Sequence, residues 1–134
     1  MDLSQPVSLT LTIPGDVRFM VTARGVAERV ARHLGGSEDE ASRIGQAVNT
    51  VIAGVIEYAF EGEAGDIEIR FDADGSRLDI HIGYEGESAG RLERALQANG
   101  GAFDAMTRVV DRVEFGRAAG LDFCRLTRDF PETT

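Results

Sequence analysis

The segment from residue 37 to residue 60 constrains the fold more than any other part of the sequence. Apolar residues recur there at steps of three and four, the spacing that places side chains on one face of an amphipathic helix. Ser37 with Glu40 three residues later is a capping-box pattern, so the helix should begin there. The apolar positions are Ile44, Ala47, Val48, Val51, Ile52, Val55, Ile56 and Ala59. A helix with one apolar face must bury that face against another layer, so the segment predicts a layered domain.

Shorter segments alternate between apolar and polar residues, as half-buried strands do. We expect strands over residues 7–13, 67–72, 78–83, 113–115 and 121–126. Asp74-Gly75 lies between the second and third of these and predicts a two-residue hairpin turn with antiparallel pairing.

Further helices are expected around this framework. Asp16 can cap a helix over residues 17–34, and two more helices should cover 91–96 and 102–110. The Gly-, Glu- and Ser-rich segment 85–101 is expected to form a loop that passes over a site. The order of elements predicts an α+β two-layer sandwich, in which helices cover one face of a mixed, mostly antiparallel sheet. Without internal repeats or a linker, residues 1–134 should form a single domain.

The charge and the cysteine content limit the function classes. A net charge of −9 would repel phosphate backbones and anionic lipid, so neither nucleic acid nor membrane is an expected partner. The single Cys124 cannot form an intramolecular disulfide, and we find no secretory signal and no apolar run long enough to span a bilayer. The expected location is the cytoplasm.

His33 and His81 have no cysteine or carboxylate cluster at ligand spacing, so each should be a solvated surface histidine rather than part of a metal site.

Three segments carry a resemblance to a known family. They run from Ala47-Val48-Asn49-Thr50 to Glu57-Tyr58-Ala59-Phe60, from Leu78-Asp79-Ile80-His81-Ile82 to Gly86, and from Asp111-Arg112-Val113-Glu114-Phe115 to Gly120. These residues and the order of elements resemble the GHKL, or Bergerat, ATP-binding fold of the histidine-kinase-like ATPases, and the small anti-sigma-factor serine kinases in particular. The resemblance covers nearly the whole chain.

The resemblance also implies that nucleotide chemistry has been lost. On its second helix the family carries a Glu, an Asn four residues on and often a His four further on, and here Thr50, Gly54 and Tyr58 hold these positions. Threonine is no general base, and glycine offers no oxygen to a magnesium ion. We therefore expect no catalytic residue, no metal site and no kinase activity.

Two other motifs of the family are altered. Its adenine-reading Asp and the following Gly correspond to Tyr84 and Gly86, and its Gly-x-Gly-Leu pattern is reduced to a segment from Gly100 to Phe103. Tyr84 shares the parity of the inward-facing strand residues, so we expect its ring to pack with that of Phe103 where adenine would lie. These positions are then a vestigial pocket without a cofactor.

Three functions remain open. The preferred hypothesis is a non-catalytic regulator similar to an anti-sigma factor, which binds a sigma factor or an anti-anti-sigma partner. The second is an ATP-binding anti-sigma serine/threonine kinase with residual activity, using ATP and Mg²⁺. The third is an interaction module unrelated to sigma regulation, and in an unrelated α+β domain Thr50, Gly54 and Tyr58 would be packing residues.

The resemblance implies two protein contacts. The family has a partner-contacting Arg near the start of its first helix, and Arg18 matches it. Related proteins pair through the first strand or first helix, so a homodimer is also expected.

Overall fold

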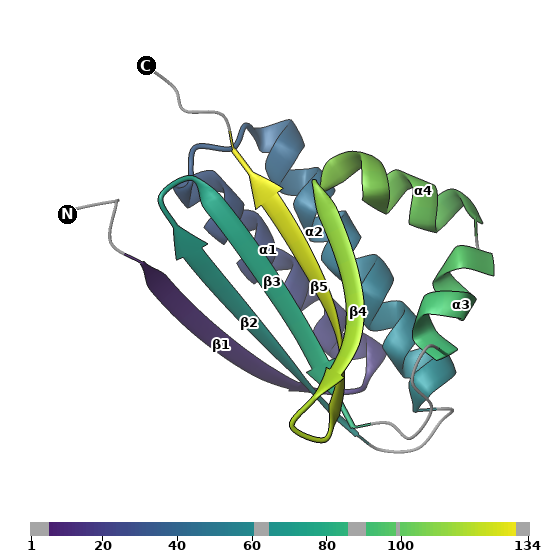
Figure 1. The fold of residues 1–134 in the computed structure, drawn as a ribbon. Helices are drawn as coiled ribbons and strands as arrows, with labels where there is room; N and C mark the ends of the chain where they lie inside the picture. The colour runs from purple at the N-terminus through teal and green to yellow at the C-terminus, as the bar shows by residue number, and fades with distance from the viewer. Residues whose placement is uncertain (1–5, 61–64, 86–90, 99, 131–134) are drawn as a thin grey trace.

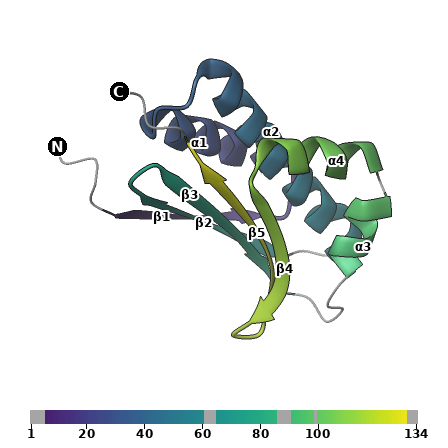
Figure 2. The same ribbon diagram turned by 45° about the horizontal axis from the view of Figure 1, so that its top comes forward.

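The chain forms a two-layer α+β structure (Figure 1). The computed structural model describes residues 6–60, 65–85, 91–98 and 100–130. One layer is a five-stranded sheet in the order β1-β2-β3-β5-β4, and the helices form the other. Figure 2 shows α1, α2 and α4 over one face of the sheet, here called the inner face, while no helix of the described residues covers the outer face. The predicted α+β architecture is confirmed.

All neighbouring strands of the described sheet run antiparallel. The strands are β1 (Val7–Pro14), β2 (Asp66–Asp74), β3 (Arg77–Tyr84), β4 (Arg112–Ala118) and β5 (Leu121–Asp129). The expectation of a mixed sheet was therefore wrong. Two helices lie between β1 and β2, so the chain returns to the end of the sheet where β1 stopped, and β2 runs back beside it. A parallel pair would require the connection to cross back to the end of the sheet where β1 begins.

The helices are α1 (Met20–His33), α2 (Glu38–Gly54), α3 (Arg91–Ala98) and α4 (Gly100–Val109). The predicted capping box of α2 is formed: Glu40 N–H donates to Ser37 Oγ at 3.1 Å, and Ser37 N–H donates to Glu40 Oε1 at 3.3 Å. These bonds satisfy two backbone donors that the first helical turn would otherwise leave unpaired.

Two of the predicted helices are less regular than periodicity suggested. The first begins with a 3₁₀ turn, Val17–Phe19, which Asp16 caps by accepting from Arg18 N–H at 2.9 Å. The second ends its α-helical part at Gly54 and continues as a π-helical turn, Val55–Ala59. In that turn Phe60 N–H donates to Val55 C=O at 3.0 Å. Apolar periodicity does not distinguish such turns from α-helix.

The two hairpins use different turns. The β2–β3 loop is Gly75-Ser76 rather than the predicted Asp74-Gly75, and Gly75 has a φ of 62°. A positive φ at the first loop residue alone is typical of a type II′ turn. The β4–β5 loop is Ala119-Gly120, and both residues have positive φ, 54° and 81°. Two positive values indicate a type I′ turn, with alanine where Asn or Asp is usual.

The core lies between the inner face of the sheet and the helices. Alternate residues of β2 and β3 are fully buried, and so is the apolar stripe of α2 that the sequence predicted. The strand residues are Ile67, Ile69, Phe71, Leu78, Ile80 and Ile82, and the helix residues include Ile44, Val48, Val51 and Ile52. Burying each such side chain contributes about 1.5–3 kcal/mol, so this interface is the main source of stability.

Candidate functional site

The candidate site lies near the end of β3 and the beginning of β5, on the side where α3 packs against the end of α2 (Figure 1). Thr50 and Gly54 belong to α2, Tyr84 ends β3, and Phe103 lies in α4, which begins at Gly100. Gly86 lies outside the described residues. The predicted positions thus come from separate elements, and α3 links two of them, because its Leu92 contacts Gly54 and also lines a cleft beside Tyr84.

Thr50 makes a local backbone hydrogen bond. Its Oγ1 donates to the carbonyl oxygen of Gln46, one helical turn earlier, at 3.0 Å. A threonine hydroxyl bonded in this way is a common feature of helix interiors. It has no property of a general base, because its ordinary pKa is far above neutrality.

Gly54 is in close contact with α3. A Cβ atom built on it would lie 2.9 Å from Leu92 Cδ1 and 3.1 Å from Leu96 Cδ2, and both leucines are buried. The position that resembles a metal ligand of the ATPases is therefore covered by two apolar side chains. Glycine at this position lets the side chains of α3 pack close to the backbone of α2.

Tyr58 lies outside the α-helical part of this segment. It is half-buried in the π-helical turn that follows Gly54. Thr50 and Gly54 lie four residues apart in α2, a spacing that places them on one face of the helix.

Tyr84 points inward, as its parity predicted, but its aromatic neighbour differs from the expected one. Only 5% of its surface is exposed, and its ring meets Phe60 edge to face, with centroids 6.4 Å apart and planes at 84°. Phe103 is half-buried and packs against the core from α4. The predicted ring pair of Tyr84 with Phe103 is absent from the ring contacts of the described residues, because Phe60, which ends the π turn, takes that place.

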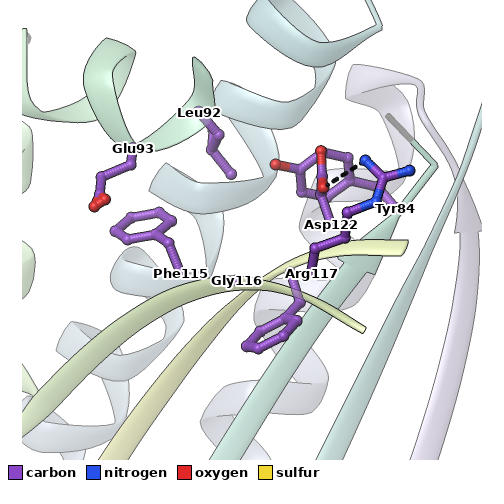
Figure 3. A pocket seen from close by; sticks show the side chains of 8 residues that line it. Tyr84, Leu92, Glu93, Phe115, Gly116, Arg117 and Asp122 are labelled. Atoms are coloured by element: carbon purple, nitrogen blue, oxygen red, sulfur yellow. Dashed lines mark hydrogen bonds and ion pairs between the residues drawn. The ribbon is translucent and has the colours of Figure 1, made fainter. Parts of the chain in front are cut away.

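A small cleft lies beside Tyr84 (Figure 3). Its volume is about 180 Å³, below the roughly 300–1,000 Å³ of common small-molecule sites. Figure 3 shows Tyr84, Asp122 and Arg117 on one side and Leu92, Glu93 and Phe115 on the other. Gly116 and Phe123 complete the lining. A cleft of this size is too small to enclose a nucleoside triphosphate.

Asp122 is a buried carboxylate that the sequence analysis missed. It lies opposite Tyr84 in the β3–β5 register, and its side chain is 5% exposed. Arg117 donates from Nη1 to Asp122 Oδ1 at 3.2 Å, which supplies the cation that a buried carboxylate needs. Burial, followed by the carboxylate of Asp122 and the thiol of Cys124, raises the pKa of the Tyr84 phenol far above its ordinary value, so Tyr84 stays neutral at physiological pH.

One sequence signal could have revealed Asp122. It shares the inward parity of Cys124 and Leu126, so the alternating pattern already placed a charged residue on the apolar side of a strand. Cys124 itself is fully buried, as expected for a small apolar group, and burial raises the pKa of its thiol to about 12.

Arg18 lies away from this cleft, in the 3₁₀ turn before α1. Its guanidinium forms an ion pair with Asp16, Nη2 to Oδ2 at 2.6 Å, and the Arg18 side chain remains 80% exposed. Its neighbours are exposed apolar residues: Val17 at 67%, Phe19 at 39% and Val21 at 72%. We call Val17, Arg18, Phe19 and Val21 the α1 patch.

The residues that the structure describes contain no group of three or more His, Cys, Asp or Glu side chains placed to hold a metal ion. Within the same residues, no helix combines the length and apolar character needed to cross a membrane.

Comparison with known proteins adds no relative. No protein-family model matches the chain, and no curated protein matches it.

Proposed function

We propose that the chain is a non-catalytic, protein-binding regulator similar to an anti-sigma factor, built on the fold of the GHKL ATPases. The observation that carries the proposal is the α1 patch. Three apolar side chains, Val17, Phe19 and Val21, remain exposed around Arg18. Aromatic and other apolar side chains beside an arginine are typical of protein interface anchors.

The contacts of Gly54 and Thr50 in the candidate site favour a function without phosphoryl transfer. Kinase chemistry needs a positioned base and a magnesium ion that neutralises phosphate charge. Here Leu92 and Leu96 cover Gly54, and the hydroxyl of Thr50 is bonded to its own helix. These contacts count against the alternative of a residual ATP-dependent kinase.

The partner class follows from the resemblance, which gives Arg18 the place of a partner-contacting arginine. A sigma factor or an anti-anti-sigma domain is the proposed partner. The guanidinium of Arg18 is accessible to such a partner, because its ion pair with Asp16 lies on the surface, where exposed pairs are only weakly stabilising.

A homodimer is the proposed assembly. β1 forms one edge of the sheet, and its inner-face residues Val7 and Leu9 are exposed, unlike the buried Ile13 at its other end. An edge strand with exposed apolar residues is suited to pairing with a second chain.

Partner binding can be measured by calorimetric titration of the purified chain against sigma factors and anti-anti-sigma domains of the source organism. Arg18→Ala and Val21→Asp should each weaken binding by about tenfold or more, as expected for interface anchors. Arg29→Ala removes an exposed arginine of α1 outside the α1 patch, so it is the matched control and should bind as the parent does. Equal affinity of all four proteins, or no binding to any candidate, would overturn the proposal.

The kinase alternative is tested in parallel by thermal unfolding with and without millimolar ATP and Mg²⁺. A specific ligand present at about 1,000 times its Kd stabilises a protein by about 4 kcal/mol, so binding would raise the Tm clearly. We expect no rise, and a clear one would favour the kinase alternative.

A further inference from the structure

The outer face of the sheet carries a histidine packed against an aromatic ring. His81 in β3 stacks on Phe123 in β5, with ring centroids 4.6 Å apart and planes at 28°. Both side chains are half-buried although no described helix covers this face. His81 was expected to be a solvated surface histidine, and it does lie on the open face of the sheet, but it is only partly exposed because Phe123 of the neighbouring strand packs against its ring. The other histidine, His33 at the end of α1, is exposed as expected.

Arginines flank His81 on both neighbouring strands. The register places it directly opposite Arg70 in β2 and Arg125 in β5. Directly opposed residues in antiparallel strands have Cβ atoms about 4.5–5.5 Å apart, and like charges in such pairs are destabilising. A protonated His81 would therefore be the middle of three adjacent cations.

The nearby carboxylates are engaged by other groups. Asp72 accepts from Arg70 Nε at 2.9 Å and from Ser8 Oγ at 2.7 Å. Asp79 accepts from Thr127 Oγ1 at 2.7 Å and pairs with Arg125 Nη2 at 3.5 Å. Each carboxylate thus balances an arginine.

Two further carboxylates lie on this face: Glu68 is exposed on β2, and Glu114 of β4 lies opposite Arg125 and pairs with Arg112 at 3.2 Å. Burial most strongly, and then Arg70 and Arg125, lower the pKa of the His81 imidazole, while Glu68 and Asp72 oppose this shift.

We propose that His81 is an acid-sensitive switch in the sheet, which keeps β3 and β5 packed while it is neutral and weakens the fold when it is protonated. This inference does not depend on the proposed function. Because the folded state disfavours the charged imidazole, the stability it contributes is fully present above the unfolded-state pKa of about 6.5. That stability is lost as the pH falls through the folded-state pKa. The switch therefore responds below about pH 6.5, down to the lowered folded-state pKa of His81.

The test combines NMR titration of the two histidines with urea unfolding at about pH 7.5 and about pH 5, in the range where histidine changes charge. The pKa of the His81 imidazole should lie below the ordinary histidine value of about 6.5. The unfolding equilibrium constant of the parent should rise on acidification by more than that of His81→Gln, by a factor approaching tenfold for each pH unit between the unfolded-state and folded-state pKa values of His81. The His33→Gln protein is the matched control and should keep the acid response of the parent.

A further variant separates the switch from simple packing. Arg125→Gln removes one flanking cation and should raise the pKa of His81, whereas Arg29→Gln on α1 should leave it unchanged. A histidine that does not sense the flanking cations would show no such shift. The proposal is overturned if the pKa of His81 is at or above the ordinary value of about 6.5, if His81→Gln keeps the full acid response, or if Arg125→Gln leaves the His81 titration unmoved.

Discussion

Among single residues, Tyr84 closes the end of the helix–sheet interface together with Phe60. Its ring meets the edge of Phe60, and Phe60 in turn lies against Gly65, where a Cβ atom would come within 2.7 Å of Phe60 Cε1. Gly15 N–H donates to Gly65 C=O at 2.6 Å and holds the two loops together. The large ring of Phe60 fits only because these loop residues have no side chains.

Truncation of Tyr84 should therefore destabilise the fold. Tyr84→Ala is expected to cost about 3–5 kcal/mol, which includes the loss of the edge contact with Phe60. Tyr84→Phe keeps the ring and should cost less than about 1.5 kcal/mol. Urea unfolding measures both values.

The chain's other tyrosine provides the control. Tyr58 is half-buried, so Tyr58→Ala should cost less than Tyr84→Ala. If the two alanine variants unfold at the same urea concentration, Tyr84 is not the closing residue that its burial indicates.

Among secondary-structure elements, the contact of α3 with α2 decides what the candidate pocket can hold. α3 contributes two buried leucines, Leu92 and Leu96, and both lie over the backbone of Gly54. Because the two helices touch at Gly54, helix packing closes the space beside this position.

Two helical glycines allow a matched test of this packing. Gly54→Ala gains helix propensity but forces a methyl group against Leu92, so it should be neutral or destabilising by up to about 2 kcal/mol. At Gly25 in α1 a Cβ atom would meet no tertiary neighbour within 4 Å, so Gly25→Ala should stabilise by about 0.5–1 kcal/mol.

Gly54→Glu extends the same test, because it places a charge in the apolar contact and should cost several kcal/mol. Thermal and urea unfolding give all three values. Equal stabilisation by Gly54→Ala and Gly25→Ala would contradict close packing of α3 on α2.

The elements could be predicted from the sequence because their signals are local. The stripe from Ile44 to Ile56 and the Ser37–Glu40 capping box lie within one segment, and the alternation of β2 and β3 is equally local. The π turn after Gly54 could not be predicted, since apolar periodicity does not distinguish it from α-helix.

The contacts of the candidate site were harder to predict for the same reason. Phe60 and Tyr84 are far apart in sequence, and so are Gly54 and Leu92. The alternation of inward and outward residues along β3 correctly placed the Tyr84 ring on the inner face. Whether Phe60 or Phe103 would be its neighbour could not be decided without the three-dimensional structure. The burial of Asp122 could have been predicted from the sequence, because it occupies an inward position on an apolar strand. A charge there needs a partner.

For the whole molecule, the two sheet edges differ in how they are protected. β4 forms one edge, and its outer-face pair of Arg112 and Glu114, 3.2 Å apart, places charge there. β1 forms the other edge and exposes Val7 and Leu9, with Leu9 46% exposed. Charged side chains are a common means of preventing edge pairing, so β1 is the edge suited to association.

The oligomeric state tests this assignment. We expect the chain to sediment as a dimer at tens of micromolar, and Leu9→Lys to shift it to a monomer, because a desolvated lysine opposes burial of the apolar face. Thr10→Lys is the matched control, since it adds the same charge to the same strand on the outer face. It should remain a dimer if association buries the inner-face residues of β1. A monomeric parent at these concentrations would exclude the homodimer. A parent dimer that survives Leu9→Lys but not Thr10→Lys would instead place the interface on the outer face, beside the stack of His81 and Phe123.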